Sequence, residues 1–460
     1  MFVIVGIAAM LAFLYIRPQE AFESMRGLTF PMVLAFTALG YVLDLASGVT
    51  RPPRMSLLIW VALAFFGWAM LTVSISAPEM INESALYFVA PASLFFATAL
   101  GIQTLRGFGA VSKVMLALTM FIVSIAIHQG FAPRLCIADT ATATATPLED
   151  AEGRIKQCTS RTDCAEAGLG FSGDLLCEHV GLMGTRSDGG RVRYIGIFQD
   201  PNELACVTSI SLPFVFMWLG EKKSKIRRLF ARITPLPVLL ASILCNIMTQ
   251  SRSGQISLIA TLGVYFVRRF GMRGIAVGGA LAVPVLLFGG RSDESSTEER
   301  LECWSEALSM WREHPVLGVG AKQFGQHYYL TAHNSALLAL SEMGPLGLLL
   351  WTIALYIAFK TTLQIQRDFA DRPEAADVRA AAFATLAGLV GMVASALFLS
   401  LTYHLAFWIE VGLAGSIQAV VWRHDPNWKL RWRWPVARSC PSAVDRVRNW
   451  TSGSRTGPPN

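Results

Sequence analysis

The residues of this sequence that could do chemistry are basic side chains and one histidine, gathered in two polar stretches. They are Arg191, Arg193, Arg300 and His333, with Asn334 directly after the histidine. A guanidinium group binds phosphate oxygens through charge-assisted hydrogen bonds, and histidine is the side chain that changes its charge near neutral pH. Such a set can hold a phosphorylated substrate while the imidazole accepts a proton.

Each of these side chains also has a structural interpretation. Arg193 falls close to the expected membrane surface, where a cation can bind a phosphate or extend toward lipid headgroups. Arg300 can stack on Trp304, one helical turn later. His333 can form a hydrogen bond at a helix interface. Position alone leaves both interpretations of each residue open.

Two short polar motifs lie next to apolar segments. Asp200, Pro201 and Glu203 predict the start of a helix, with Asp200 as N-cap, Pro201 in the first turn and Glu203 closing a capping box. Arg252 lies in the tetrapeptide 251–254 between two apolar segments. It is a third arginine that could contact the substrate, or it could pack at the helix ends.

The elements that must position these residues are membrane helices. The 460 residues are 53% hydrophobic and only 15% charged, so a soluble domain of this composition would expose too much apolar surface. The net charge of +7 invites a nucleic-acid partner. We exclude one, because the cations lie in short connectors between apolar segments, as in membrane proteins.

Twelve apolar segments predict an all-α polytopic membrane protein with about twelve transmembrane helices. The segments are 2–16, 29–47, 56–76, 84–102, 114–132, 203–220, 234–250, 255–267, 274–290, 335–359, 380–400 and 404–422. The first has no cleavage pattern after it, so we expect a retained helix and not a signal peptide. The resulting regions are helices one to five (1–132), a long loop (133–202), helices six to nine (203–290), a second long loop (291–334), helices ten to twelve (335–422) and a basic tail (423–460).

The distribution of Lys and Arg predicts the orientation of these helices. With a cytoplasmic N-terminus, the five inside connectors hold 17 Lys and Arg, whereas the four short outside connectors hold only Arg17, Arg26 and Arg252. The positive-inside rule therefore places both termini, including the tail sequence 431–434, in the cytoplasm. The two long loops then lie on the periplasmic face of a bacterial inner membrane, and long loops commonly carry function.

The first long loop holds four of the eight cysteines, which are Cys136, Cys158, Cys164 and Cys177. An even number in an extracytoplasmic loop predicts two disulfides, and three pairings are possible. A zinc site is the alternative, but the loop lacks the closely spaced Cys pairs of structural zinc modules, so we expect no metal. The alternating Thr and Ala residues of 140–146 predict a flexible surface segment.

The second long loop begins with a capping box at 296–299 and continues as an amphipathic helix that ends before Pro315. Its apolar residues recur at helical spacing and predict a helix lying along the membrane surface; they are Leu301, Trp304, Leu308 and Trp311. Further on, Gly344, Pro345 and Gly347 lie inside the tenth apolar segment. They predict a bent helix and the close approach of another backbone.

Four of these motifs, taken in order, resemble the O-antigen ligase and Wzy-type polymerase superfamily. His333-Asn334, followed at fixed spacing by Gly344 and Gly347, is similar to its signature. Three further segments resemble its upstream loop, its domain opening and the turn before its catalytic loop: 193–203, 251–254 and 311–320. The resemblance covers about residues 190–360.

This resemblance implies a fold of the lipid-sugar glycosyltransferase (GT-C-like) type and an inverting, metal-independent transfer without a cofactor. It implies an undecaprenyl-pyrophosphate-linked glycan as donor and, as acceptor, a lipid A core or a growing polysaccharide, all at a lipid membrane. Arg193 and Arg300 would hold the pyrophosphate, and His333 would be the essential histidine. We expect three further substrate-binding residues: Arg191, Arg252 and Asn334.

Other functions remain open at this stage. Ligases, polymerases and protein O-oligosaccharyltransferases share these motifs and differ in the acceptor. A lipid-glycan flippase or transporter would predict ionisable residues inside several spans and two recognisable halves. In this sequence we expect Glu342 and a few histidines near the span ends as the exceptions in nearly uncharged spans, and we find no internal repeat.

Overall fold

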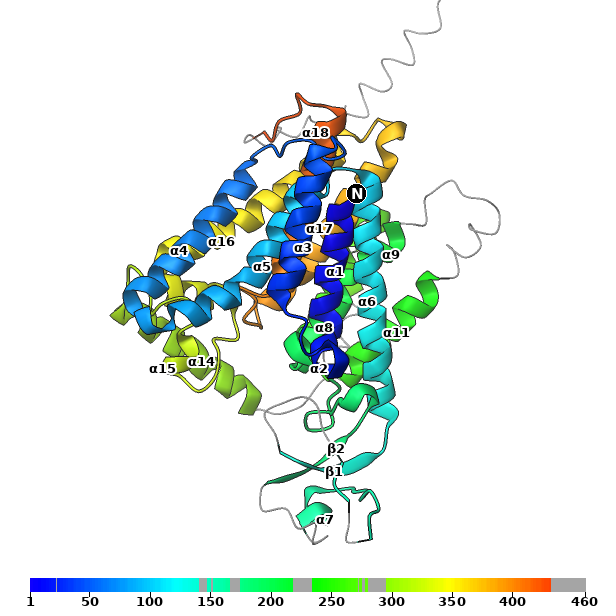
Figure 1. Cartoon of the computed structure of the whole chain (residues 1–460), viewed down its shortest axis with the longest axis vertical. Coiled ribbons are helices and arrows are strands. Elements are labelled where there is room, and N and C mark those ends of the chain that lie inside the picture. Colours follow the sequence, from blue (N-terminus) through cyan, green and yellow to red (C-terminus); the bar gives the residue numbers. More distant parts are fainter. Residues whose placement is uncertain are drawn as a thin grey trace, which may run out of the picture. The chain divides into compact units, whose positions relative to one another are not determined.

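Helices make up most of the described chain in the computed structural model (Figure 1). The structure describes residues 1–21, 23–139, 147–149, 152–165, 174–217, 234–271, 273–274, 278–279 and 295–431. Residues 1–426 form one unit and residues 427–460 a second. The tail residues 432–460, the low-complexity segment 140–146 and most of the ninth apolar segment lie outside the described residues.

Helices lie on eleven of the twelve predicted apolar segments. They are α1 (Phe2–Ile16), α3 (Phe30–Ala46), α4 (Leu57–Ser76), α5 (Ile81–Gly101), α6 (Leu105–Phe131), α8 (Pro201–Ser211) with α9 (Pro213–Met217), α11 (Pro235–Met248), α12 (Arg252–Phe270), α16 (Ser335–Asp368), α17 (Ala376–Ala396) and α18 (Leu405–His424). The amphipathic helix of the second long loop is α14 (Ser295–Glu313), and α15 (Phe324–His327) follows it.

Six helical segments among the described residues are long and apolar enough to cross a membrane. They are Leu57–Ser76, Pro78–Gly101, Leu105–Phe131, Ser335–Asp368, Pro373–Ala396 and Leu405–His424. The apolar helices α1, α3 and α11 have 15, 17 and 14 residues, so they are shorter than the ~20 residues that span a typical hydrocarbon core. The chain is therefore an α-helical, multi-pass membrane protein, and the predicted count of twelve goes beyond these six.

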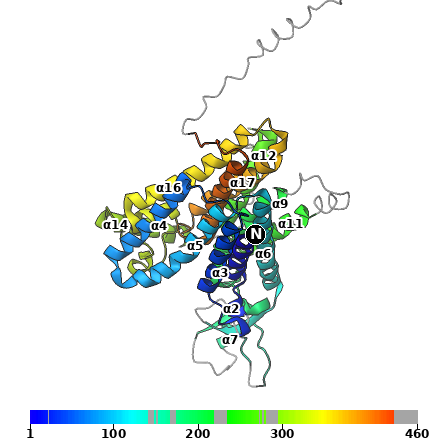
Figure 2. The ribbon, with the colours of Figure 1, turned by 45° about the horizontal axis from the view of Figure 1, so that its top comes forward.

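Helix α18 lies at the centre of the helical unit, and nearly all of its residues are buried. It packs against α5, α16 and α17, and an aromatic group surrounds Trp408. The ring of Trp408 lies 4.6 Å from that of Phe66 and 4.9 Å from that of Phe65. Helix α1 lies beside α3 and α6, as Figures 1 and 2 both show.

The first long loop departs from the all-α expectation, because it forms a small two-stranded sheet. Strand β1 (Arg134–Ala138) pairs antiparallel with β2 (Leu175–His179), and Cys136 lies opposite Cys177. The short helix α7 (Arg161–Ala165) lies between them in sequence. Both strands have only five residues, and neither alternates apolar and polar side chains, so the sequence carries no strand pattern for them.

One disulfide joins this small sheet to α7, and a second joins it to the segment before α7. Cys136 bonds to Cys164, and Cys158 bonds to Cys177. The sulfurs of Cys136, Cys158 and Cys164 lie close enough together to suggest a metal site, but sulfurs in disulfides do not supply thiolate ligands. Among the other cysteines, Cys206, Cys245 and Cys303 are buried and unpaired, and the predicted free Cys440 lies outside the described residues.

We expect non-reducing peptide mapping to recover these two pairs and neither alternative pairing. The bonds close loops of 28 and 19 residues, for which chain entropy gives a stabilisation of about 3 kcal/mol each. Replacing both partners of one bond by serine should therefore make the loop a preferred site of limited proteolysis, while the Cys206→Ser control keeps the wild-type digestion pattern. Free thiols at all four loop cysteines would contradict the pairing.

Helix α16 is broken at Gly344, as the sequence predicts. Gly344 has φ 64° and ψ −171°, a conformation that only glycine adopts without strain. A Cβ atom at Gly344 would lie 2.1 Å from the carbonyl oxygen of Val316. The loop that follows α14 therefore passes directly over the break.

The break frees three carbonyl groups, and neighbouring segments satisfy all of them. Pro345 has no N–H to donate to the carbonyl of Ser341, and the N–H of Val319 donates to it instead at 2.9 Å. The N–H of Gly320 donates to the carbonyl of Glu342, and the carbonyl of Met343 accepts from the indole of Trp68 at 2.9 Å. The break and the loop thus form one hydrogen-bonded unit.

Replacing Gly344 by alanine should destabilise the protein by at least about 2 kcal/mol, because the backbone conformation and the space both exclude a Cβ atom. The measurement is the thermal unfolding midpoint of the detergent-solubilised protein. Gly263→Ala is the matched control, since a Cβ atom at Gly263 in α12 meets no atom within 4 Å. An unchanged midpoint for Gly344→Ala would contradict the close approach of the two backbones.

Candidate active site

The motif at the start of α8 contains two acidic residues, Asp200 and Glu203, which differ in their roles. Asp200 is the N-cap, as expected, and its Oδ1 accepts from the backbone N–H of Asn202 at 2.8 Å. The capping box predicted for Glu203 is wrong. The Glu203 carboxylate lies 3.8 Å from Nε2 of His404 instead, because the loop that precedes α18 packs over the start of α8.

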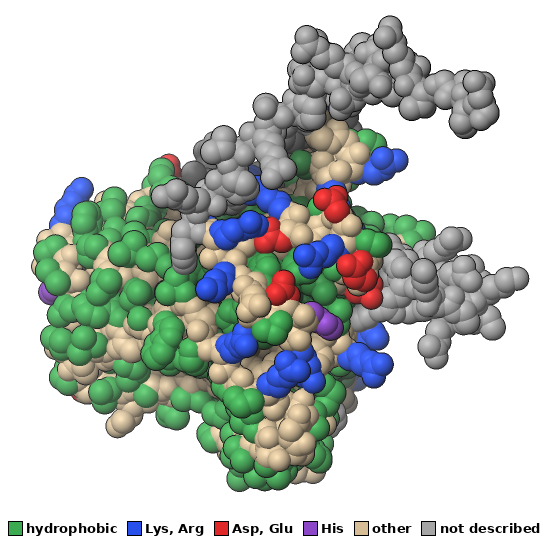
Figure 3. Space-filling view, turned by 90° about the horizontal axis from the view of Figure 1, so that it is seen from above, with side chains coloured by type: hydrophobic (Ala, Val, Ile, Leu, Met, Phe, Trp, Pro, Cys, Tyr) green, Lys and Arg blue, Asp and Glu red, His purple; other side chains and the backbone are tan. Residues whose placement is uncertain are grey.

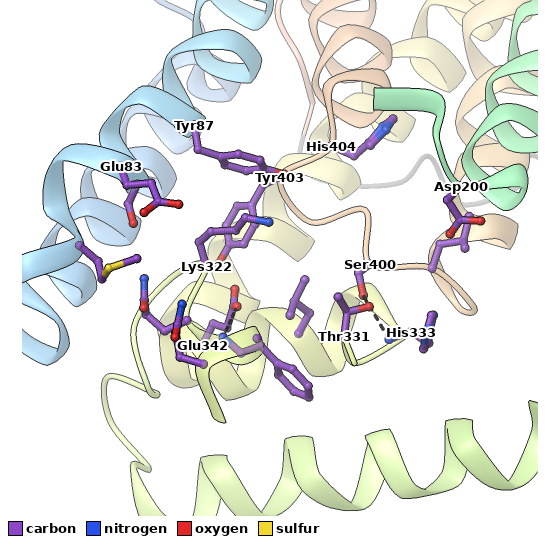
Figure 4. Close-up of a pocket in the computed structure, with 18 of the residues that line it drawn as sticks. Glu83, Tyr87, Asp200, Lys322, Thr331, His333, Glu342, Ser400, Tyr403 and His404 are labelled. Atoms are coloured by element: carbon purple, nitrogen blue, oxygen red, sulfur yellow. Dashed lines mark hydrogen bonds between the residues drawn. The ribbon is translucent and has the colours of Figure 1, made fainter. Parts of the chain in front are cut away.

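His333 is held at the entrance to α16 in a strained backbone conformation. Its φ of 47° is uncommon for a residue with a Cβ atom, and such residues often lie at functional sites. Its N–H donates to Oγ of Ser400 at 3.1 Å, and the Ser400 hydroxyl donates to Thr331 at 3.0 Å. The loop between α17 and α18 therefore holds the backbone from which the imidazole extends (Figure 4).

Asn334, which we expected to bind substrate, has a structural role in this arrangement. Its Oδ1 accepts from the N–H groups of Ala336 and Leu337 as the N-cap of α16, and its Nδ2 donates to the carbonyl of Leu397 at 3.2 Å. Because both ends of the amide are used, Asn334 positions His333 through the backbone.

Helix α14 brings Arg300 to the site. Its buried face, with Cys303, Ala307 and Met310, packs against α16. The apolar face predicted from the sequence, which runs from Leu301 to Trp311, is partly or fully exposed. Such exposure suits a helix at a membrane surface. Figure 2 shows α14 beside the ends of α4 and α16. The guanidinium of Arg300 lies 5.9 Å above the ring of Phe398, which replaces the expected contact with Trp304. The side chains of 295–297, which would form the capping box, lie outside the described residues.

Three arginines form one positively charged group, the arginine cluster of Arg191, Arg252 and Arg300. Burial lowers the pKa of the Arg300 guanidinium, the nearby charges of Arg252 and Arg191 lower it further, and Asp200 opposes them. Arg252 is the first residue of α12, whose N-cap is Ser251. Within the described residues neither Arg252 nor Arg300 has a carboxylate ion-pair partner.

Arg191 joins this cluster from the end of the first long loop. Its Nε donates to the carbonyl of Thr249 at 3.0 Å, and its terminal nitrogen donates to Oδ1 of Asn202 at 3.1 Å. The side chain is thereby fixed between the start of α8 and the turn before α12.

Arg193 lies at the edge of the cluster and faces the disulfide-bonded loop. Its Nε donates to the carbonyl of Arg186 at 3.1 Å, and its backbone N–H donates to Gln129. Burial lowers its pKa and the charge of Arg186 lowers it further, while the charges of Asp188, Glu178 and Asp200 raise it. Arg193 and Arg300 therefore share Asp200, but Arg191 is the closer electrostatic neighbour of Arg300.

His333 lies beside the arginine cluster. Burial lowers the pKa of its imidazole, the positive charge of Arg300 lowers it further, and Asp200 raises it. The imidazole is therefore neutral at pH 7 and can accept a proton. Of the predicted site residues, the structure brings His333 together with the cluster of Arg191, Arg252 and Arg300, and it leaves Arg193 at the rim.

A cavity of about 470 Å³ opens beside His333 (Figure 4). Its wall comes from the start of α5, the start of α8, the loop around α15 and the segment before α18. Ionisable and aromatic groups dominate the wall; they are Glu83, Tyr87, Asp200, Glu203, Lys322, His333, Glu342, Tyr403 and His404. Asp200 and His333 lie together on one side of Figure 4, and Glu83 and Tyr87 lie on the other.

Buried contacts fix the loop that carries Lys322. The carboxylate of Glu342 accepts from the N–H of Phe324 at 2.9 Å, and the ammonium of Lys322 lies 4.4 Å above the ring of Tyr87. Lys322 itself has φ 68°. This acid inside α16 therefore orders the cavity wall, a use that the sequence did not reveal.

From the sequence we did not identify several of the residues that line the cavity. Asp200 and Glu203 were assigned to helix capping alone, although two acids beside Arg191 and Arg193 were a signal of paired charge. Tyr403 and His404 directly precede an apolar segment, and nothing in their spacing marks them. Their approach to Glu203 depends on how distant helices pack.

The apolar helices also hold more acid than we expected. Besides Glu342, Asp44 in α3 and Glu410 in α18 are buried. Asp44 accepts from the N–H of Val3 at 2.9 Å, whereas the carboxylate of Glu410 has no hydrogen-bond partner among the described residues. From the sequence we expected Glu342 as the acidic exception in nearly uncharged spans, and the structure adds Asp44 and Glu410 to it.

Comparison with known families is consistent with this site. Residues 237–352 match the family described as O-Antigen ligase. The matched region runs from α11 to the middle of α16, so it includes Arg252, Arg300 and His333 but neither Arg191 nor Arg193. This match confirms the resemblance seen in the sequence. A comparison with curated proteins gave no match.

Proposed function

We propose that this chain belongs to the O-antigen ligase and Wzy-type superfamily and is a membrane glycosyltransferase that uses undecaprenyl-pyrophosphate-linked glycans on the periplasmic face. The observation that carries the proposal is the position of His333, which lines a polar cavity and has Arg300 of the arginine cluster as a charged neighbour. The family match supports a glycosyl-transferring activity.

The arginine cluster is suited to the pyrophosphate of the donor. Breaking a sugar–pyrophosphate bond places negative charge on the leaving phosphate. Fixed guanidinium groups in a partly desolvated site stabilise that charge better than water does. We assign this role to Arg300, Arg252 and Arg191, with Arg193 at the rim, so that the cluster supplies the positive charge from protein side chains.

His333 is suited to activate the acceptor. In an inverting transfer the acceptor hydroxyl attacks the sugar carbon from the face opposite the pyrophosphate, and its proton must leave. The neutral imidazole next to the cluster can accept that proton. The same positive charge of Arg300 that lowers the pKa of His333 keeps it in the proton-accepting form.

The cavity is suited to the acceptor sugar. Its volume of about 470 Å³ falls within the range of ligand pockets. The carboxyl groups of Glu83 and Glu203 can form hydrogen bonds with hydroxyl groups, and the rings of Tyr87 and Tyr403 offer apolar faces to a sugar ring. The acceptor would then meet the donor at His333.

The predicted topology fits this assignment. Twelve spans with cytoplasmic termini would place the cavity, α14 and the disulfide-bonded loop in the oxidising periplasm. A flippase is the alternative, and the buried acids Asp44 and Glu410 are the observation that favours it.

Glycan profiling of a deletion strain, complemented with the wild-type chain or an empty vector, tests the function. Bare lipid A core with long carrier-linked chains in the deletion strain indicates a ligase. Single repeat units on the carrier indicate a polymerase, and loss of glycan from proteins indicates an O-oligosaccharyltransferase.

Transfer by the purified protein in detergent separates an enzyme from a flippase, because a flippase forms no product there. We expect a glycosylated acceptor to form from lipid-linked donor, and to form at an unchanged rate in EDTA, because arginines supply the positive charge. The absence of any product from donors matched to the strain would contradict the proposal.

A further inference from the structure

A second cavity, of about 250 Å³, is lined by three arginines, Arg51, Arg54 and Arg423, together with Gln103 and Trp422. Among the described residues no Asp or Glu lines it. Three guanidinium groups around one cavity without an acid in its wall create a strongly positive potential. The cavity is therefore suited to an anion.

This cavity lies at the opposite end of the helices from His333. Gln103 lies two residues after the end of α5, whose first turns contribute Tyr87 to the cavity beside His333. Arg423 lies in the last turn of α18, and His404 is the N-cap of the same helix. Since both helices run from one cavity to the other, the two cavities face opposite membrane surfaces.

Hydrogen bonds to backbone groups hold the segments from which the three arginines extend. The N–H of Arg51 donates to Oε1 of Gln103 at 3.0 Å, and Nε2 of Gln103 donates to the carbonyl of Arg51 at 2.9 Å. The guanidinium of Arg54 donates to the carbonyl of Pro426 at 2.8 Å. Within the described residues none of the three guanidinium groups pairs with a carboxylate.

An exposed apolar face continues directly from this cavity. Leu57, Trp60 and Leu63 recur every three residues in the first turns of α4, so they share one face, and they are 45%, 56% and 41% exposed. Tryptophan is typical of the level where lipid headgroups meet hydrocarbon. A molecule with its phosphate among the arginines would find a surface for acyl chains along α4, which a free phosphate would not use.

We propose that this cavity binds the phosphate headgroup of an anionic phospholipid from the leaflet opposite the His333 site. Arg51, Arg54 and Arg423 contact the phosphate, and the acyl chains lie along α4. Figure 3 views this end of the molecule and shows Lys and Arg side chains gathered there, with hydrophobic side chains over the neighbouring flank. Basic pockets between membrane helices bind anionic lipid headgroups through the same forces.

Titration of the purified full-length chain with phosphatidylglycerol in detergent, followed by native mass spectrometry and thermal unfolding, tests the site. We expect bound phosphatidylglycerol and a raised unfolding midpoint, and no such effect from phosphatidylcholine. Since each arginine near a headgroup changes the affinity about five-fold, Arg51→Gln with Arg54→Gln should weaken binding about thirty-fold. Unchanged affinity in this double variant would overturn the site.

Matched variants keep the test specific. Arg51→Lys with Arg54→Lys preserves the charge and should retain most of the affinity. Arg372→Gln removes one exposed cation from the connector between α16 and α17, at the same end but outside the cavity, and should leave binding unchanged.

Two further arms separate the remaining outcomes. The guanidinium of Arg51 makes no hydrogen bond within the described residues, so Arg51→Gln alone, expected to weaken binding about five-fold, serves if the double variant misfolds. Inorganic phosphate should not raise the unfolding midpoint at concentrations where the lipid does. Equal stabilisation by inorganic phosphate would overturn the lipid assignment.

Discussion

Replacing Arg300 by alanine should lower the rate of glycan transfer about 100- to 1000-fold. The guanidinium is half-buried beside Arg252 and Arg191, where it can stabilise the charge that develops on the leaving pyrophosphate. Removing one such fixed donor typically costs this much. The measurement is the single-turnover rate of the purified variant with lipid-linked donor, with accumulation of that donor in cells as the second readout.

Matched variants separate this role from a structural one. Arg312→Ala removes an exposed cation from the same helix, outside the cluster, and should keep the wild-type rate. Arg300→Lys keeps the charge without the bidentate geometry and should recover part of the rate.

The two arginines of the first long loop can be ranked in the same assay. If Arg191 belongs to the cluster and Arg193 to its rim, Arg191→Ala loses more activity than Arg193→Ala. The reverse order would restore the assignment that the sequence favoured. Full activity in Arg300→Ala, Arg191→Ala and Arg252→Ala would exclude the cluster from the reaction.

Replacing His333 by glutamine should lower the rate about 100- to 10,000-fold, because the general base is lost while the side chain stays polar. His327→Gln, in the nearby α15, is the control for loss of an imidazole close to the site. The two variants should unfold at the same temperature as the wild type. A His333→Gln variant with unaltered turnover would remove the imidazole from the mechanism.

The pH profile tests the same role without a large loss of activity. Burial and Arg300 lower the pKa of His333 below its ordinary value of 6.5, so the neutral, active form persists to mildly acidic pH and is lost only below that. Asp200 raises this pKa. Asp200→Asn retains a good N-cap for α8 and should move the acid limb of kcat/KM to lower pH. A shift to higher pH would contradict the electrostatic coupling.

Local features of the structure were predictable because they depend on neighbours in sequence. Runs of apolar residues predicted the helices, and Gly344 with Pro345 predicted the break in α16. Proline lacks an N–H and glycine adopts conformations closed to other residues, and both effects are independent of contacts with distant segments. The cap at Asp200 followed for the same reason. The disulfide pairing did not, because the sequence holds no information on which strands meet.

Contacts between distant segments account for the features that the sequence did not predict. Arg191 and Arg193 lie two positions apart in the sequence. Only the packing of α12 and of the disulfide-bonded loop decides which of the two side chains lies closer to Arg300. Glu203 meets His404 across 201 positions of sequence because the segment before α18 folds over α8. The cavity is a product of such contacts.

The three carbonyls freed at the break in α16 have a consequence for how substrates enter. The loop that satisfies two of them through Val319 and Gly320 could swing away only by leaving bare carbonyls at membrane depth, at a cost of several kcal/mol. This segment therefore cannot serve as a moving gate. In the proposed function, a lipid-linked donor would therefore have to reach His333 without displacing this segment.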